Sequence, residues 1–153
     1  MAKSYYSTVF DQPADVVWSM IRDFNNYPLW VDGAGTSQIE HGKSGDAVGC
    51  VRSVLYGGRL IRQRLLALSD TERAQTYAFA EEGALPVQDY QATLRITPIV
   101  DGGCAFVEWW ATFDCAPQER DARVAFFRDA FAGWLASLRR RLGRDAMSGV
   151  AAA

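Results

Sequence analysis

The sequence has few of the residues from which metal sites and acid–base pairs are usually built. Its 153 residues include one histidine, His41, and three cysteines, Cys50, Cys104 and Cys115, without a Cys-x-x-Cys spacing. A metal site would need Cys or carboxylate ligands to complete it, so we predict no metal and no cofactor. The three cysteines are typical of buried free thiols. No Gly-x-Ser-x-Gly motif supports a Ser-His-Asp site built on His41.

The chain also lacks a strong charge of either sign and any long apolar run. Its 16 basic and 18 acidic residues give a net charge of −2, which argues against a basic nucleic-acid surface. No run approaches the roughly 18 apolar residues of a membrane span, and MAKSYYSTVF lacks the apolar segment of a signal peptide. We therefore expect a cytoplasmic protein with no nucleic-acid partner and no stable membrane insertion. The oligomeric state stays open.

The predicted elements are one strand, two short helices, a run of strands and a long helix. Residues 4–10 alternate as a strand does, DQPADVVWSMIRDF forms a short amphipathic helix that begins near Pro13, and NNYPLWV forms a second short helix or turn. Hairpin turns, of which Gly57-Gly58 is the strongest signal, then join about six antiparallel strands. Their sequences are TSQIEHG, GCVRSVLY, RLIRQRLLAL, RAQTYAFAE, VQDYQATLRIT and CAFVEWWATFD.

A long amphipathic helix is predicted from Pro117 to Gly143, because proline favours helix starts and glycine favours helix ends. Its apolar residues recur at three and four positions, which is the spacing of one helix face: Val124, Phe127, Phe131, Leu135, Leu138 and Leu142. Such a face needs an apolar surface to cover, and the sheet offers one. Residues 144–153 are expected to be frayed. The run 139–141, three arginines near the predicted end, is expected to complement the helix dipole.

Four stretches in order over residues 4–142 carry a family resemblance: QPADVVWSMIRDFNNYPLW, GGRLIRQRLLALSDTERAQTYAF, GALPVQDYQATLRITP and VEWWATFD. Together they resemble the START/Bet v 1-like (SRPBCC) superfamily and, within it, the bacterial polyketide cyclase/dehydrase-like group. The resemblance implies an α+β helix-grip fold, in which a curved antiparallel sheet of about seven strands wraps around a long C-terminal helix, with two short helices after the first strand. It implies one ligand-binding domain over residues 1–143 with an internal cavity.

The loop GALPVQDY, residues 83–90, carries Leu85 and Pro86 where a turn between two strands should be polar. The resemblance implies that this loop is similar to the gate loop that closes over hormone in the plant abscisic-acid receptors. We therefore predict that Leu85 covers a ligand. A scattered surface leucine with no role is the alternative.

Strand alternation assigns the residues that face the helix. Glu108 marks the outward face of the last strand, so Trp109 faces inward and Trp110 outward. On RLIRQRLLAL the arginines are placed outward, because buried arginines without carboxylates are costly, and Gln63 faces inward. Arg52 shares the inward alternation, with its role left open. The predicted ligand-binding residues, with Trp30 and Leu85 at the cavity mouth, are Trp30, Val54, Tyr56, Ile61, Gln63, Leu65, Tyr77, Phe79, Leu85, Pro86, Tyr90, Ala92, Trp109, Phe127 and Phe131.

Three functions fit this set. The first is binding of a small, largely apolar molecule, aromatic, polyketide-like or lipid-like, in a cavity closed by residues 83–90. The second is a polyketide cyclase/aromatase or dehydratase in the same cavity, which needs a proton donor or acceptor. The inward set holds no Asp, Glu or His, and Gln63 stands where the family's receptors often carry a ligand-contacting Glu, so catalytic residues stay unassigned. The third is an interaction module resembling a chaperone cofactor. We predict the first.

Overall fold

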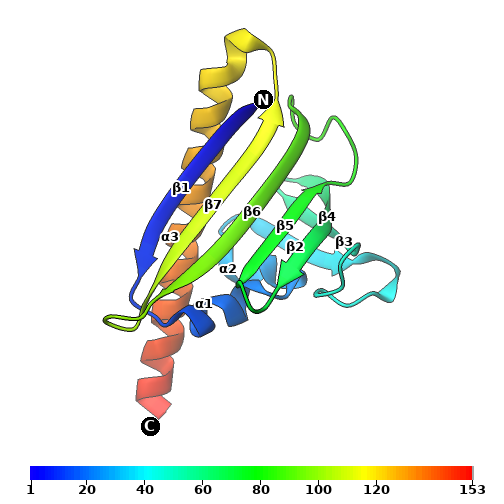
Figure 1. Ribbon diagram of the computed structural model, residues 1–153. Helices are drawn as coiled ribbons and strands as arrows, with labels where there is room; N and C mark the ends of the chain where they lie inside the picture. The colour runs from blue at the N-terminus through cyan, green and yellow to red at the C-terminus, as the bar shows by residue number, and fades with distance from the viewer. Residues whose placement is uncertain (153) are drawn as a thin grey trace.

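Seven antiparallel strands form one sheet in the order β1-β7-β6-β5-β4-β3-β2 (Figure 1). The computed structural model describes the backbone of residues 1–152 and the side chains of all of these except residues 148 and 150–152. The strands are β1 (Ala2–Phe10), β2 (Ala34–Ile39), β3 (Val51–Tyr56), β4 (Arg59–Ser69), β5 (Ala74–Phe79), β6 (Gln88–Ile99) and β7 (Cys104–Asp114).

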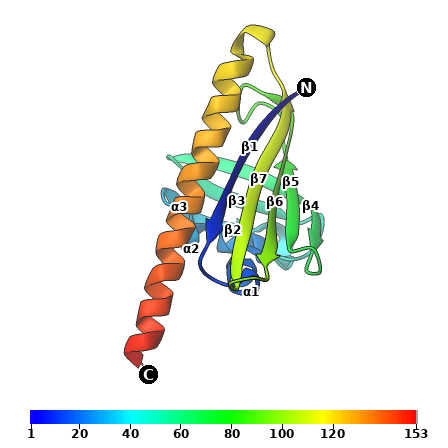
Figure 2. The ribbon, with the colours of Figure 1, turned by 60° about the vertical axis from the view of Figure 1, so that its left-hand side comes forward.

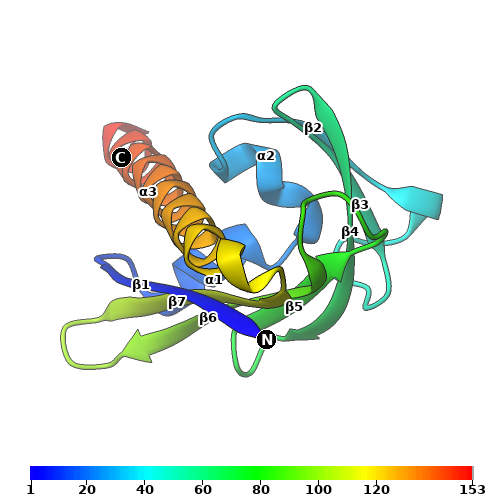
Figure 3. The ribbon, with the colours of Figure 1, turned by 90° about the horizontal axis from the view of Figure 1, so that it is seen from above.

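Three α-helices lie on the concave side of this sheet. They are α1 (Ala14–Ile21), α2 (Tyr27–Trp30) and α3 (Arg120–Ala152), with 3₁₀ turns at Phe24–Asn26, Glu40–Gly42 and Pro117–Glu119. Seen from above, the sheet curves so that β4, β3 and β2 rise beside α2, while α3 lies over β1 and β7 (Figure 3). This arrangement confirms the predicted helix-grip fold.

The Gly57-Gly58 hairpin forms as predicted. The two glycines have φ angles of 57° and 78°, and Tyr56 pairs with Arg59 across them. A two-residue turn with positive φ at both positions matches the right-handed twist of the flanking strands. The turn therefore sets the register of β3 against β4, which places Arg52 opposite Gln63.

Alternation on β6 and β7 also matches the prediction. The inward residues are all buried: Tyr90, Ala92, Leu94 and Ile96 on β6, and Val107, Trp109, Ala111 and Phe113 on β7. Trp110 faces outward and is half-buried between Lys3 and Arg95. Glu108 also faces outward but is largely covered, because it accepts hydrogen bonds from Tyr5 and Arg95.

The prediction that the last helix ends at Gly143 is wrong. The helix α3 begins at Arg120 and continues to Ala152, and its C-terminal end extends past the sheet (Figure 2). A glycine inside a helix costs only about 1 kcal/mol relative to alanine, and Arg141 pairs with Asp145 across it. The frayed tail predicted for residues 144–153 is thus helical as far as residue 152, and Ala153 lies outside the described residues. Within the described chain, no helix is long and apolar enough to span a bilayer.

The three arginines of run 139–141 hold α3 against neighbouring elements. Because the helix continues for another eleven residues, the predicted role at its C-terminal dipole is wrong. Their partners are the Thr8 hydroxyl and the Val9 carbonyl for Arg139, the Asp32 carboxylate for Arg140, and the Leu29 carbonyl and Asp145 carboxylate for Arg141. These contacts fix α3 to β1 and to the segment around α2.

Candidate functional site

A cavity of about 100 Å³ lies between α3 and the part of the sheet that α3 does not cover. The helix packs mainly on β1 and β7, so the inner faces of β3, β4 and β5 are left for other side chains to fill. The cavity is lined by Tyr27, Val54, Tyr56, Ile61, Gln63, Tyr77, Phe79, Leu85, Tyr90, Phe126, Phe127 and Trp134. Gln63 supplies the only amide side chain, and the other walls are aromatic or aliphatic.

Nine of the residues predicted from the sequence line this cavity. They come from β3, β4, β5, β6, α3 and the loop at residues 83–90: Val54, Tyr56, Ile61, Gln63, Tyr77, Phe79, Leu85, Tyr90 and Phe127. Each strand residue in this group has the inward alternation that the sequence predicts. Alternation was therefore sufficient to find most of the wall.

Five predicted residues are buried in the core instead of lining the cavity: Trp30, Leu65, Ala92, Trp109 and Phe131. The Trp109 and Phe131 rings stack with centroids 4.8 Å apart, and Trp30 packs 5.8 Å from Trp109. The prediction that Trp30 lies at the mouth is therefore wrong. These large rings fill the space between α3 and β7, so the cavity does not extend to them. Pro86, the remaining predicted residue, is exposed on the loop.

Three lining residues were absent from the predicted set: Tyr27, Phe126 and Trp134. The Trp134 indole donates a hydrogen bond to the Tyr56 hydroxyl at 3.0 Å, and the two rings are nearly perpendicular. Trp134 also meets the edge of Tyr27. Leu135, which the spacing along α3 placed on the apolar face, is fully buried, and its neighbour Trp134 lines the cavity.

The loop at residues 83–90 covers the cavity with one side chain. Leu85 is half-buried and packs against the core, whereas Pro86 beside it is exposed. The Val87 N–H donates to the Leu85 carbonyl at 2.8 Å, a tight turn that directs Val87 into the core. Gly83 and Asp89 at either end have φ angles of 88° and 50°. Leu85 therefore lies over the cavity, which is the position expected for a lid residue.

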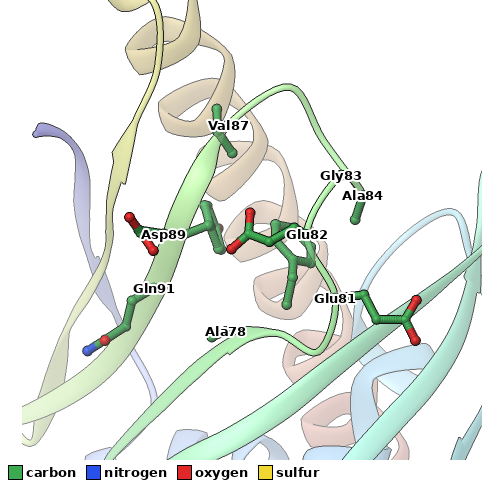
Figure 4. Close-up of a pocket in the computed structure, with 10 residues that line it drawn as sticks. Ala78, Glu81, Glu82, Gly83, Ala84, Val87, Asp89 and Gln91 are labelled. Carbon is green, nitrogen blue, oxygen red and sulfur yellow. The ribbon is translucent and has the colours of Figure 1, made fainter.

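A second hollow, of about 260 Å³, lies on the other side of the same loop and opens to solvent. Glu81, Glu82 and Asp89 are among the residues that line it, and Figure 4 shows the Glu82 carboxylate between the other two, which point outward to either side. Phe79 and Tyr90 line both this hollow and the inner cavity. An acidic, open hollow does not suit an apolar ligand, so the inner cavity is the better candidate.

The polar end of the cavity is built on a buried arginine. Arg52 is 2% exposed and lies opposite Gln63 in the β3–β4 register. Its Nη1 donates to the Phe24 carbonyl at 2.8 Å, and its Nη2 donates to the Gln63 side-chain oxygen. The guanidinium lies 3.8 Å from the centre of the Phe24 ring and 4.1 Å from that of Tyr27. Cation–π contacts therefore stabilise a charge that water does not reach.

Burial sets the protonation of the groups around this end. It lowers the pKa of Arg52 to about 10, so the guanidinium stays charged at neutral pH. Burial raises the pKa of Tyr77 to about 12, against the opposing effect of the Arg52 charge. It also raises the pKa of Tyr27 and Tyr90 well above the ordinary value. The three tyrosines are therefore protonated at neutral pH and serve as hydrogen-bond donors, not as bases.

No acid or histidine side chain is among the residues that line the cavity. His41 lies in the exposed turn after β2, with a φ angle of 58°. Among the described residues, no cluster of His, Cys, Asp and Glu side chains could hold a metal ion. The chemistry that this arrangement supports is hydrogen bonding and charge stabilisation inside an aromatic wall.

The family model described as polyketide cyclase/dehydrase and lipid transport matches residues 1–144. The chain belongs to this family. A search of curated proteins finds no match. The family description covers both enzymes and lipid transport, so membership alone does not decide what this chain does.

Solved structures share the fold over almost the whole chain. Protein XoxI of Bacillus cereus is 25% identical with a TM-score of 0.81, covering 93% of this chain and 96% of its own. A Thermobifida fusca protein is 26% identical with a TM-score of 0.82, covering 94% and 95%. The di-domain ARO/CYC protein BexL, from the BE-7585A biosynthetic pathway, is 15% identical with a TM-score of 0.79, covering 94% of this chain and 47% of BexL. At that identity BexL shows the fold alone.

Proposed function

We propose that this protein binds a small, largely apolar molecule in the inner cavity, with Leu85 of the 83–90 loop closing over it. The observation that carries the proposal is the aromatic wall that surrounds a space between α3 and β3–β5. Ligand sites of this kind are concave and mostly apolar, with a few polar groups that fix orientation. Gln63 and the tyrosine hydroxyls are those groups here.

The volume limits the size of the molecule. A cavity of about 100 Å³ is comparable to the engineered cavity of roughly 150 Å³ that holds benzene. It therefore suits a single ring or a short chain. A longer apolar tail would extend out of the cavity between Tyr56, Phe126 and Trp134. These three residues also line an open groove of about 690 Å³ beside α3.

Binding is favoured over catalysis because the cavity wall offers no base. A cyclase or dehydratase moves protons to and from a carbonyl or hydroxyl group, and the raised pKa values of Tyr77 and Tyr90 keep these phenols from accepting one at neutral pH. An interaction module has less support, because the arginines of run 139–141 are engaged inside the chain.

The proposal is tested with benzyl alcohol as a neutral single-ring probe, followed by NMR chemical-shift titration. Val54 is 1% exposed on the cavity wall, whereas its neighbour Leu55 is 41% exposed on the opposite face. Val54→Phe fills the cavity, and Leu55→Phe adds the same ring outside it. We expect saturable binding to the wild type and to Leu55→Phe, and no binding to Val54→Phe.

Thermal melting establishes that Val54→Phe is folded, since overpacking a core typically costs about 1–3 kcal/mol. Unchanged binding of benzyl alcohol to folded Val54→Phe would place the probe elsewhere and reject the cavity as the site. Absence of saturable binding to the wild type, both of benzyl alcohol and of the ionised single-ring probe benzoate, would reject the proposed function itself.

A further inference from the structure

Arg52 carries a buried positive charge that no carboxylate in the described part of the chain neutralises. Its two terminal nitrogens donate to neutral oxygens, the Phe24 carbonyl and the Gln63 amide. Its Nε is buried without an acceptor among the described residues. Burying a charge is costly unless it is paired. The surroundings of Arg52 therefore favour a partner that brings negative charge close to it.

Arg52 also fixes which end of the Gln63 amide faces the cavity. The amide oxygen accepts from Arg52, so the amide N–H groups are the atoms left to face the space that Gln63 lines. No protein atom in the described structure accepts a hydrogen bond from the Gln63 side-chain nitrogen. An amide normally offers both a donor and an acceptor, but here Arg52 leaves only the donors available to a ligand.

The neighbouring hydroxyls add further donors. Tyr27 and Tyr77 line the cavity beside Gln63, and their rings lie 4.1 Å and 5.8 Å from the Arg52 guanidinium. Both phenols keep their protons at neutral pH, as shown above. This end of the cavity therefore combines N–H and O–H donors with one positive charge behind them. A group that matches it accepts several hydrogen bonds and carries negative charge.

We propose that the ligand carries a single carboxylate at the end that faces Gln63, an inference that rests on the proposed binding function. The Gln63 amide and the tyrosine hydroxyls donate to the carboxylate oxygens. Arg52 acts through Gln63 as a positioning residue and supplies the compensating charge. A phosphate group carries about −1.5 to −2 charges at neutral pH, which exceeds the one positive charge present.

Two probes of similar size test this at pH 7: benzoate, which is ionised, and benzyl alcohol, which is neutral. The wild type is expected to bind benzoate at least tenfold more tightly than benzyl alcohol, as measured by calorimetry. Arg52→Met keeps an unbranched side chain and removes the charge. We expect this variant to lose the benzoate advantage, so that the ratio of the two affinities approaches one, a change that a purely structural role would not produce.

Gln63→Glu gives a second test that does not depend on the folding of Arg52→Met. It places an internal carboxylate beside Arg52, so the affinity for benzoate should fall at least tenfold relative to the affinity for benzyl alcohol. Gln91→Glu adds the same charge on the exposed outward face of β6 and should change neither affinity. Equal affinity of the wild type for both probes would overturn the proposal that the ligand carries a carboxylate. Benzoate binding unaffected by Gln63→Glu would overturn it as well. Binding of neither probe overturns the proposed function, and with it this inference.

Discussion

Two adjacent tryptophans on β7 show how one residue of displacement along a strand changes the environment of a side chain. Trp109 is 1% exposed and stacks on Phe131, whereas Trp110 lies half-buried under Lys3 and Arg95 on the outer face. Successive side chains of a strand point to opposite faces. Both residues are tryptophans, so the difference between their contributions to the free energy of unfolding reflects the different environments of the two faces.

Trp109→Ala is expected to lower the free energy of unfolding by about 3–5 kcal/mol, the usual cost of truncating a buried tryptophan. Trp110→Ala should cost about 1 kcal/mol or less, because surface truncations have small effects and cation–π contacts at exposed sites are weak. Urea melts of the two variants provide the comparison. Equal losses would contradict the assignment of the inner face.

At the scale of elements, the loop between β5 and β6 has one residue fixed in the core, Val87, and one that is only partly buried over the cavity, Leu85. Val87 is 6% exposed and belongs to the core, while Leu85 two residues earlier is only half-buried over the cavity. Gly83, with its φ angle of 88°, gives the backbone the freedom that loop opening requires. The loop is therefore anchored at Val87, and we expect it to open around Leu85.

Leu85→Ala should weaken binding of benzyl alcohol by about tenfold, because covering a leucine is worth roughly 1.5–3 kcal/mol and about 1.4 kcal/mol is one decade of affinity. Its cost to the stability of the free protein should stay near 1 kcal/mol, since the side chain is only partly buried. The matched control is Pro86→Ala, which alters an exposed neighbour. A loss of several kcal/mol in the free protein would identify Leu85 as core and reject the lid.

At the scale of the whole molecule, a carboxylate at the end of β4 joins the helical layer to the sheet. Asp70 accepts a hydrogen bond from the Trp18 indole at 2.7 Å and two from the Arg22 guanidinium. The Arg22 and Trp18 hydrogen bonds lower the pKa of Asp70 to about 2 from an ordinary value of 3.8. Both donors lie on or just after α1, which packs under β6 and β7.

This depressed pKa predicts an acid-sensitive contribution to stability. A carboxyl group with a lower pKa in the folded state stabilises the protein above its unfolded pKa, and the contribution disappears as the pH falls through the folded value. Stability should therefore decline between about pH 3.8 and pH 2, and Asp70→Asn should show a shallower decline there. Asp101→Asn, in the exposed turn before β7, is the control. Parallel pH profiles for the wild type and Asp70→Asn would contradict this assignment.

Features that depend on local geometry were predictable from the sequence. The Gly57-Gly58 turn requires positive φ angles that glycine adopts readily, and the alternation of Val54, Gln63 and Tyr77 follows from the two-residue period of a strand. The end of α3 was predicted wrongly because Gly143 is also tolerated within a helix. Arg141 and Asp145 span that glycine at the i,i+4 spacing of a helix, a local signal that favours continuation of the helix.

The sequence by itself determined the order of the elements, the register of the central hairpin and which side chains face the helix, because these follow from periods of two and 3.6 residues. Only the tertiary structure decided the size and chemistry of the cavity. Trp109 fills space because Phe131 of α3 stacks on it. Arg52 becomes a buried charge because the segment around α2 closes over it with Phe24 and Tyr27. Volume and desolvation depend on side chains from distant segments at once, which no local pattern contains.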